Sequence, residues 1–159
     1  VLNLLYLVDK GLLDIPVLYL SRHITQNKPI YYRYLLEVTT LGAWEQWVLF
    51  MLEAVKTTAQ WTTNRIRSIR DLLERTAEQM RQNIPKIYTR ELAELIFVNP
   101  YCRISDLVDS GVAKRQTAAT YLKAMVSEGL LEEVKVGREN LYINPALLAL
   151  LSERGQTNI

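Results

Sequence analysis

The side chains best suited to binding chemistry lie in the segment AKRQTAATYLK, residues 113–123. Its hydrogen-bond donors are Lys114, Arg115, Gln116, Thr117, Thr120 and Lys123, and no acidic residue interrupts them. Such side chains bind phosphate oxygens and reach base edges in the major groove of DNA. The spacing predicts a recognition helix, and we expect Lys135 and Arg138 to add contacts from a nearby hairpin.

The charge of the surrounding region argues in the opposite direction. The whole chain carries 19 basic and 17 acidic residues, and residues 86–159 carry nine of each. A domain with no net positive charge has weak non-specific affinity for DNA. Two interpretations of this region therefore remain open, DNA binding and a protein-contact or dimerisation role.

Single residues limit the other kinds of site. His23 is the one histidine, which excludes a multi-histidine metal site, and Cys102 is the one cysteine, which excludes an internal disulfide. A lone thiol fits a reducing compartment, so we expect a cytoplasmic location. Both residues lack catalytic neighbours in the sequence, and we expect them to pack in the interior.

The N-terminal half is predicted to consist of helices, which would position any functional site in the chain. Val1–Lys10 is predicted to be an apolar helix that Gly11 ends, and it lacks the pattern of a signal peptide. Pro29 suits the first turn of a helix to about Thr40, with Tyr32, Leu35, Leu36 and Val38 as expected core. A longer periodic stretch, residues 44–83, predicts one helix with a kink near residues 62–64. Ile84–Pro85 ends it, so we expect domains at 1–84 and 85–159.

The C-terminal half follows a different order. Helices are predicted over residues 90–98, 104–108 and 112–128, with Gly111 and Gly129 as breaks. Leu131, Val134 and Val136 on one arm and Leu141 and Ile143 on the other predict a hairpin that turns at Gly137. A last helix begins at Pro145. This order is typical of a winged helix-turn-helix.

Four blocks together resemble one family. LLYLVDKGLLDIPVLYLS, NKPIYYRYLLEV, WEQWVLFMLEAV and the segment from PYCRISDLV to LYINP are similar in order and spacing to the C-terminal part of long bacterial Fic/Doc-family proteins. The resemblance implies a mainly α fold. It would comprise the C-terminal helices of an all-α Fic domain, a long connecting helix and a winged helix-turn-helix with a small β-hairpin.

The resemblance also implies an activity, the transfer of AMP from ATP with Mg²⁺ to a hydroxyl of a target protein. The motif H-P-F-x-D/E-G-N-G-R-x-x-R that performs it in the family does not occur in these 159 residues. We therefore expect this chain alone to be inactive and to hold no cofactor. Its apolar beginning indicates a boundary cut through a helix, with the motif before Val1.

One part of the nucleotide site would be retained. Tyr31 and Tyr32 match an aromatic pair that lies beside adenine and ribose in the family, and aromatic faces stack on purines. Successive helical residues point about 100° apart, so the two rings have different surroundings.

The expected partners follow from these alternatives. An adenylyltransferase would bind a target protein, a transcription regulator would bind duplex DNA, and a docking module would bind protein alone. We expect no membrane association, and a homodimer would cover the apolar helix at residues 1–10.

Overall fold

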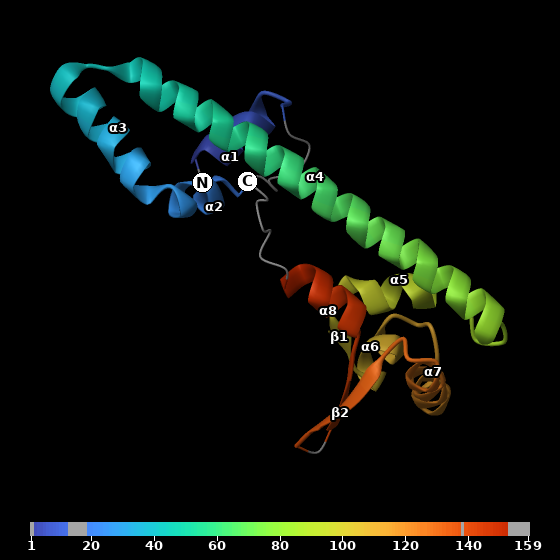
Figure 1. Ribbon diagram of the computed structural model, residues 1–159. Coiled ribbons are helices and arrows are strands. Elements are labelled where there is room, and N and C mark those ends of the chain that lie inside the picture. The colour runs from blue at the N-terminus through green and yellow to red at the C-terminus, as the bar shows by residue number, and fades with distance from the viewer. Residues whose placement is uncertain (1, 13–18, 138, 153–159) are drawn as a thin grey trace. The chain divides into compact units, whose positions relative to one another are not determined.

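The computed structural model describes residues 2–12, 19–137 and 139–152 and is mainly helical with one small antiparallel sheet (Figure 1). The chain divides into two compact units, residues 1–66 and 67–159. The division lies inside the longest helix, α4 (Trp44–Asn83), which runs without interruption through residues 62–64. Within the described part of the chain, no helix is both long and apolar enough to cross a bilayer.

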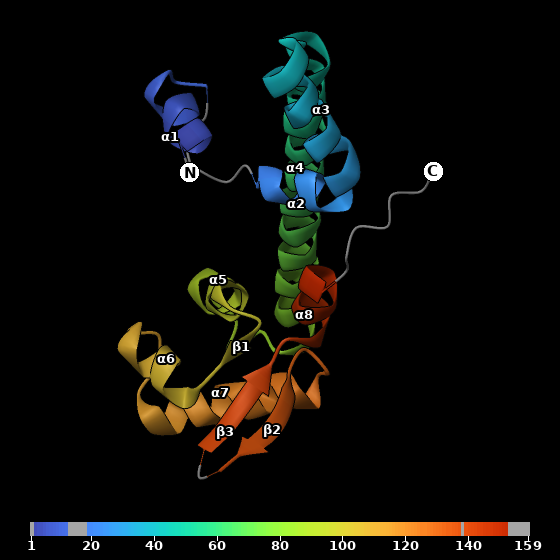
Figure 2. The ribbon, with the colours of Figure 1, turned by 90° about the vertical axis from the view of Figure 1, so that its left-hand side faces the viewer.

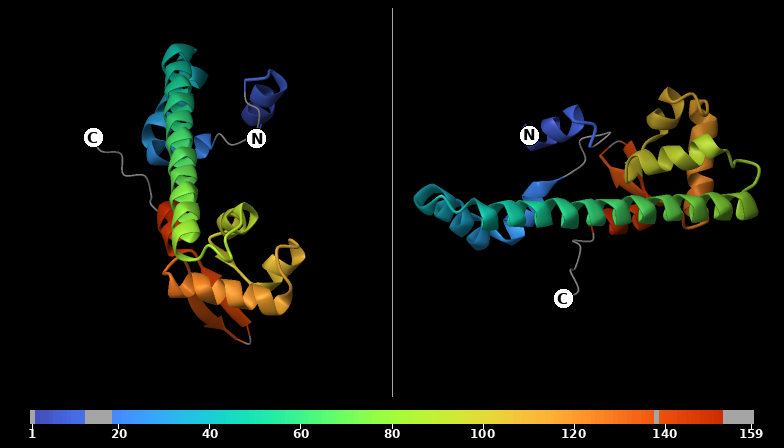
Figure 3. Two further views of the ribbon diagram at one scale, coloured as in Figure 1. Left: turned by 90° about the vertical axis from the view of Figure 1, so that its right-hand side faces the viewer. Right: turned by 90° about the horizontal axis from the view of Figure 1, so that it is seen from above.

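Unit 1 contains α1 (Leu2–Asp9), α2 (Leu20–Gln26), α3 (Lys28–Leu41) and the first part of α4. Pro29 occupies the first turn of α3, where its missing N–H costs no hydrogen bond. Gly42 ends α3 with a φ of 65°, a left-handed conformation that favours glycine, and α4 begins two residues later. Figure 3 shows α3 and α4 as a helical hairpin.

Aromatic rings join these helices around Phe50 of α4. The centroid of the Phe50 ring lies 5.1 Å from His23, 6.0 Å from Tyr31 and 6.1 Å from Tyr34. The face of α3 that meets α4 therefore carries Tyr31 and Tyr34. The prediction that Tyr32, Leu35 and Leu36 are core residues is wrong, since they are 62%, 37% and 62% exposed.

Unit 2 contains the end of α4 and seven further elements. These are α5 (Arg90–Val98), β1 (Tyr101–Cys102), α6 (Ile104–Asp109), α7 (Arg115–Ser127), β2 (Glu132–Val136), β3 (Glu139–Ile143) and α8 (Pro145–Ser152). The strands form an antiparallel sheet in the order β1-β3-β2, with the β2–β3 hairpin extending beside α7 (Figure 2). Its register pairs Val136 with Glu139 and Cys102 with Tyr142.

One apolar core holds unit 2 together. Its fully buried members come from α4, α5, α6, α7 and the sheet: Ala77, Met80, Leu92, Ala93, Ile96, Leu107, Ala118, Leu122, Met125 and Tyr142. Because Ala77 and Met80 belong to this core, the end of α4 groups with the elements that follow it. The division between residues 66 and 67 therefore precedes the boundary that the sequence predicts at residue 84.

Candidate functional site

The donor side chains of the predicted recognition helix lie on the exposed side of α7. Ala118, Leu122 and Met125 face the core and are fully buried. The donors Lys114, Arg115, Gln116, Thr117, Thr120 and Lys123 are all exposed. The helical period thus separates a packed apolar face from exposed polar positions, and the six predicted residues are exposed on α7 or just before it.

The turn between α6 and α7 fixes where that surface begins. Gly111 has a φ of 76°, and the backbone N–H of Val112 donates to the carbonyl of Leu107 at 3.1 Å. Val112 is therefore bonded to the end of α6. For this reason α7 begins at Arg115, three residues later than predicted. Lys114 has extended backbone angles, φ −71° and ψ 156°, and precedes the helix.

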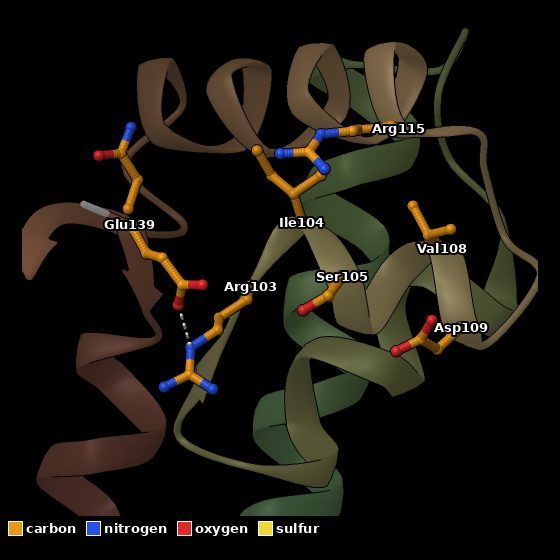
Figure 4. Close-up of a pocket in the computed structure, with 8 residues that line it drawn as sticks. Arg103, Ile104, Ser105, Val108, Asp109, Arg115 and Glu139 are labelled. Carbon is orange, nitrogen blue, oxygen red and sulfur yellow. Dashed lines mark ion pairs between the residues drawn. The ribbon is translucent and has the colours of Figure 1, made fainter.

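A groove of about 450 Å³ lies between α6, the start of α7 and β3 (Figure 4). Its charged lining has both signs, with Arg103 and Arg115 against Asp109 and Glu139. The Nε of Arg103 lies 3.3 Å from Oε2 of Glu139, and both side chains are more than half exposed. Exposed ion pairs contribute little to stability, so this pair mainly sets the local charge.

The β2–β3 hairpin carries acidic residues beside the predicted DNA contacts Lys135 and Arg138. Lys135 is exposed on β2, which also carries Glu132 and Glu133, and Glu139 begins β3. Arg138 lies outside the described residues. An anionic duplex would meet acidic and basic groups together at this hairpin, which weakens the phosphate attraction expected of it.

Glu133 has a local role that no sequence motif indicated. Its Oε1 accepts hydrogen bonds from Nδ2 of Asn140 at 2.5 Å and from the hydroxyl of Tyr142 at 3.1 Å. Burial raises the pKa of the Tyr142 hydroxyl, and the bond to Glu133 acts in the same direction. Only the register of β2 on β3 brings these side chains together.

The two predicted nucleotide-binding tyrosines have different surroundings. Tyr31 is half-buried against Phe50, whereas Tyr32 is 62% exposed, and their rings meet edge to face at 5.4 Å. Tyr32 is therefore the more accessible of the two rings. Among the described residues, no group of three His, Cys, Asp or Glu side chains is placed to hold a metal, so we assign no Mg²⁺ ligand.

His23 and Cys102 are packed, as the sequence predicts. Nδ1 of His23 lies 3.0 Å from the hydroxyl oxygen of Thr57, and its ring tilts against Phe50. Cys102 is 4% exposed, and burial raises the pKa of its thiol to about 12, with a smaller contribution from Asp106. A thiol that stays protonated at neutral pH is a poor nucleophile.

The C-terminal half of the chain matches a known protein family. Residues 72–147 match the family described as protein adenylyltransferase SoFic-like, C-terminal domain. The matched range begins in the last part of α4 and ends in α8, so it covers most of unit 2. This match supports a relation between this part of the chain and Fic-type proteins.

Proposed function

We propose that this chain is the C-terminal part of a Fic-family protein adenylyltransferase, an enzyme that transfers AMP from ATP to a protein hydroxyl. The match of residues 72–147 to the C-terminal domain of such enzymes carries the proposal. The helices of unit 1 would complete the catalytic domain, and unit 2 would be an accessory winged helix-turn-helix. In this interpretation, the wing is the β2–β3 hairpin and α7 is the recognition helix.

Tyr32 would bind adenine, and Tyr31 would hold the Tyr32 ring in place. The support is the geometry of the pair, since one ring is anchored on Phe50 and the other is exposed. The general base and the phosphate-binding loop would come from a segment that carries the H-P-F motif, which these 159 residues lack. Bound ATP with Mg²⁺ would supply the AMP group that is transferred.

The test compares this chain with the same chain preceded by its upstream coding sequence. AMP transfer from labelled ATP to a protein should occur with the extended protein and be absent from the 159 residues alone. Tyr32→Ala in the extended protein should raise KM for ATP about tenfold, since stacking of a base on an aromatic ring contributes about 1–3 kcal/mol. Tyr19→Ala removes a tyrosine that is equally exposed, and it should leave KM unchanged.

Two results would contradict the proposal. Transfer by the 159 residues alone would show that the reactive groups lie within them. An upstream sequence without the H-P-F motif, together with no transfer, would remove the enzyme assignment itself.

A second candidate function is DNA binding by unit 2, and it is favoured by one observation. Lys114 and the first three residues of α7, Arg115, Gln116 and Thr117, are consecutive and exposed, and residues 112–123 contain no acid. If the proposal holds, binding to duplex DNA should weaken with salt and should be lost in the Lys114→Ala, Arg115→Ala double variant. Lys56→Ala, an exposed lysine of unit 1, serves as the control. If the double variant binds DNA as tightly as the unaltered chain, α7 is not the DNA-binding helix.

A further inference from the structure

Among the residues that the structure describes, β2 pairs with a strand on one side only. The strand order β1-β3-β2 places β2 at the outside of the sheet, with β3 on its one hydrogen-bonded side (Figure 2). All five residues of β2 are exposed. An exposed edge strand presents unpaired N–H and C=O groups that can pair with another strand. The side chains of β2 determine whether such pairing is favoured.

The register shows which backbone groups are available. Val136 pairs with Glu139 directly beside the two-residue connection between the strands, so this is a hydrogen-bonded pair. Antiparallel pairs alternate, and Val134 and Glu132 therefore also direct their backbone groups at β3. The N–H and C=O groups of Glu133 and Lys135 point away from β3, toward the free edge.

A second copy of β2 can meet this edge in three antiparallel registers that place outward-directed groups opposite each other. Centring the pair on Glu133 sets Glu133 opposite Glu133, and centring it on Lys135 sets Lys135 opposite Lys135. Like charges directly opposite each other are destabilising. Centring the pair on Val134 sets Glu133 opposite Lys135 twice, because the two-fold axis repeats every contact.

The register centred on Val134 pairs the outward backbone groups by hydrogen bonds and places opposite charges beside each other. Glu133 and Lys135 form two hydrogen-bonded pairs with their counterparts, which makes four backbone hydrogen bonds. The two bonds that Glu133 accepts from Asn140 and Tyr142 use Oε1, so Oε2 can face the partner's lysine. On the other side of the strand, Val134 meets Val134, and its side chain is 39% exposed in one copy.

We propose that β2 is a homodimer surface, on which two copies pair antiparallel about Val134 and join their sheets into one. A lysine alone on an edge strand would repel its own copy, and Glu133 two residues earlier converts that repulsion into complementarity. The contact is one short strand from each copy, well below the roughly 1,200 Å² of a stable interface, so we expect a weak, concentration-dependent dimer. This inference is independent of the proposed enzymatic function.

Charge exchange gives the sharpest test. Lys135→Glu places acids opposite acids, and it should weaken self-association about tenfold or more in sedimentation equilibrium. Glu133→Lys should do the same by placing lysines opposite lysines. An equimolar mixture of the two variants restores both pairs and should form a heterodimer of about wild-type affinity. Lys86→Glu makes the same charge change at an exposed residue between α4 and α5 and should leave self-association unchanged.

Amide hydrogen exchange checks the register and covers the chance that Glu133→Lys unfolds the hairpin. In the unaltered chain, the amides of Glu133 and Lys135 should become protected as concentration rises, while that of Val134 is protected throughout. A chain that stays monomeric at hundreds of micromolar overturns the proposal. So does a dimer that Lys135→Glu leaves intact, or one in which the two outward amides exchange freely.

Discussion

Cys102 lies in β1 opposite Tyr142, and both side chains are withdrawn from solvent, at 4% and 0% exposed. Burial disfavours the thiolate and raises the pKa of Cys102 to about 12. The group therefore contributes stability that is fully present below pH 9, and this stability is lost as the pH rises toward 12. At neutral pH the thiol is protonated in both the folded and the unfolded chain.

The reactivity of this thiol measures its burial. In the native chain at pH 8, we expect Cys102 to react with a disulfide reagent many times more slowly than a free thiol. In denaturant, the rate should rise to that of an unfolded cysteine. Equal rates in the two states would contradict the burial of β1 against β3.

A second residue-scale prediction concerns Leu122, which is fully buried in the core of unit 2. Leu122→Ala should lower the free energy of unfolding by about 2–5 kcal/mol, because it removes apolar contacts and leaves a cavity. Denaturant titration followed by circular dichroism measures the change. Leu148→Ala is the matched control, since Leu148 is 42% exposed and should cost much less.

At the scale of elements, α5 has a well-defined beginning. The hydroxyl of Thr89 accepts a hydrogen bond from the N–H of Leu92 at 3.1 Å, which satisfies one backbone donor of the first turn. Leu92 and Ala93, just inside α5, are fully buried core residues. The Thr89 cap therefore stabilises the first turn of α5, which positions Leu92 and Ala93 in the core.

Thr89→Ala should destabilise unit 2 by about 1 kcal/mol and lower its Tm by several degrees. Thr120→Ala provides the comparison, because Thr120 is an exposed residue inside α7 whose hydroxyl donates to the carbonyl of Gln116. Its loss should change Tm by less than a third as much. Equal effects in the two variants would show that the cap does not stabilise α5.

The sequence predicts these elements well where the pattern is long. The helices at residues 44–83 and 90–98 have the predicted bounds, because their periodicity and their end signals agree. β1 was not predicted, since two residues are too few to show alternation, and the strand exists only through pairing with β3. The prediction of core residues on α3 was wrong because periodicity identifies an apolar face without showing what covers that face.

The candidate sites were predictable to different degrees. The donors around the start of α7 could be named because they are close together in the sequence, and all six are exposed in the structure. The groove that joins Arg103, Arg115 and Glu139 depends on three elements brought together by the fold. No local pattern of residues contains that information, and the same holds for Glu133 beside Tyr142.

At the scale of the whole molecule, the two units differ in how much they bury. The core of unit 2 contains a dozen buried side chains, whereas the described residues of unit 1 that are buried are Ala54 and Thr58. Burial of apolar surface is the main source of folding free energy. The units should therefore differ strongly in stability.

We expect residues 67–152 alone to melt cooperatively, with a Tm close to that of unit 2 in the whole chain. Residues 1–66 alone should show a broad, weakly cooperative transition. Circular dichroism and amide exchange of the two fragments make the comparison. A fragment 67–152 without a cooperative transition would mean that unit 2 depends on residues before the division.

The positions of the tryptophans allow the stabilities of the two units to be compared in the intact chain. All three, Trp44, Trp47 and Trp61, belong to the first part of α4, and residues 67–159 contain none. Indole emission is thus an optical reporter of unit 1 alone, while tyrosine and far-ultraviolet signals include unit 2. During denaturation the emission should change first, and the gap between the two curves would give the difference in stability within one intact polypeptide.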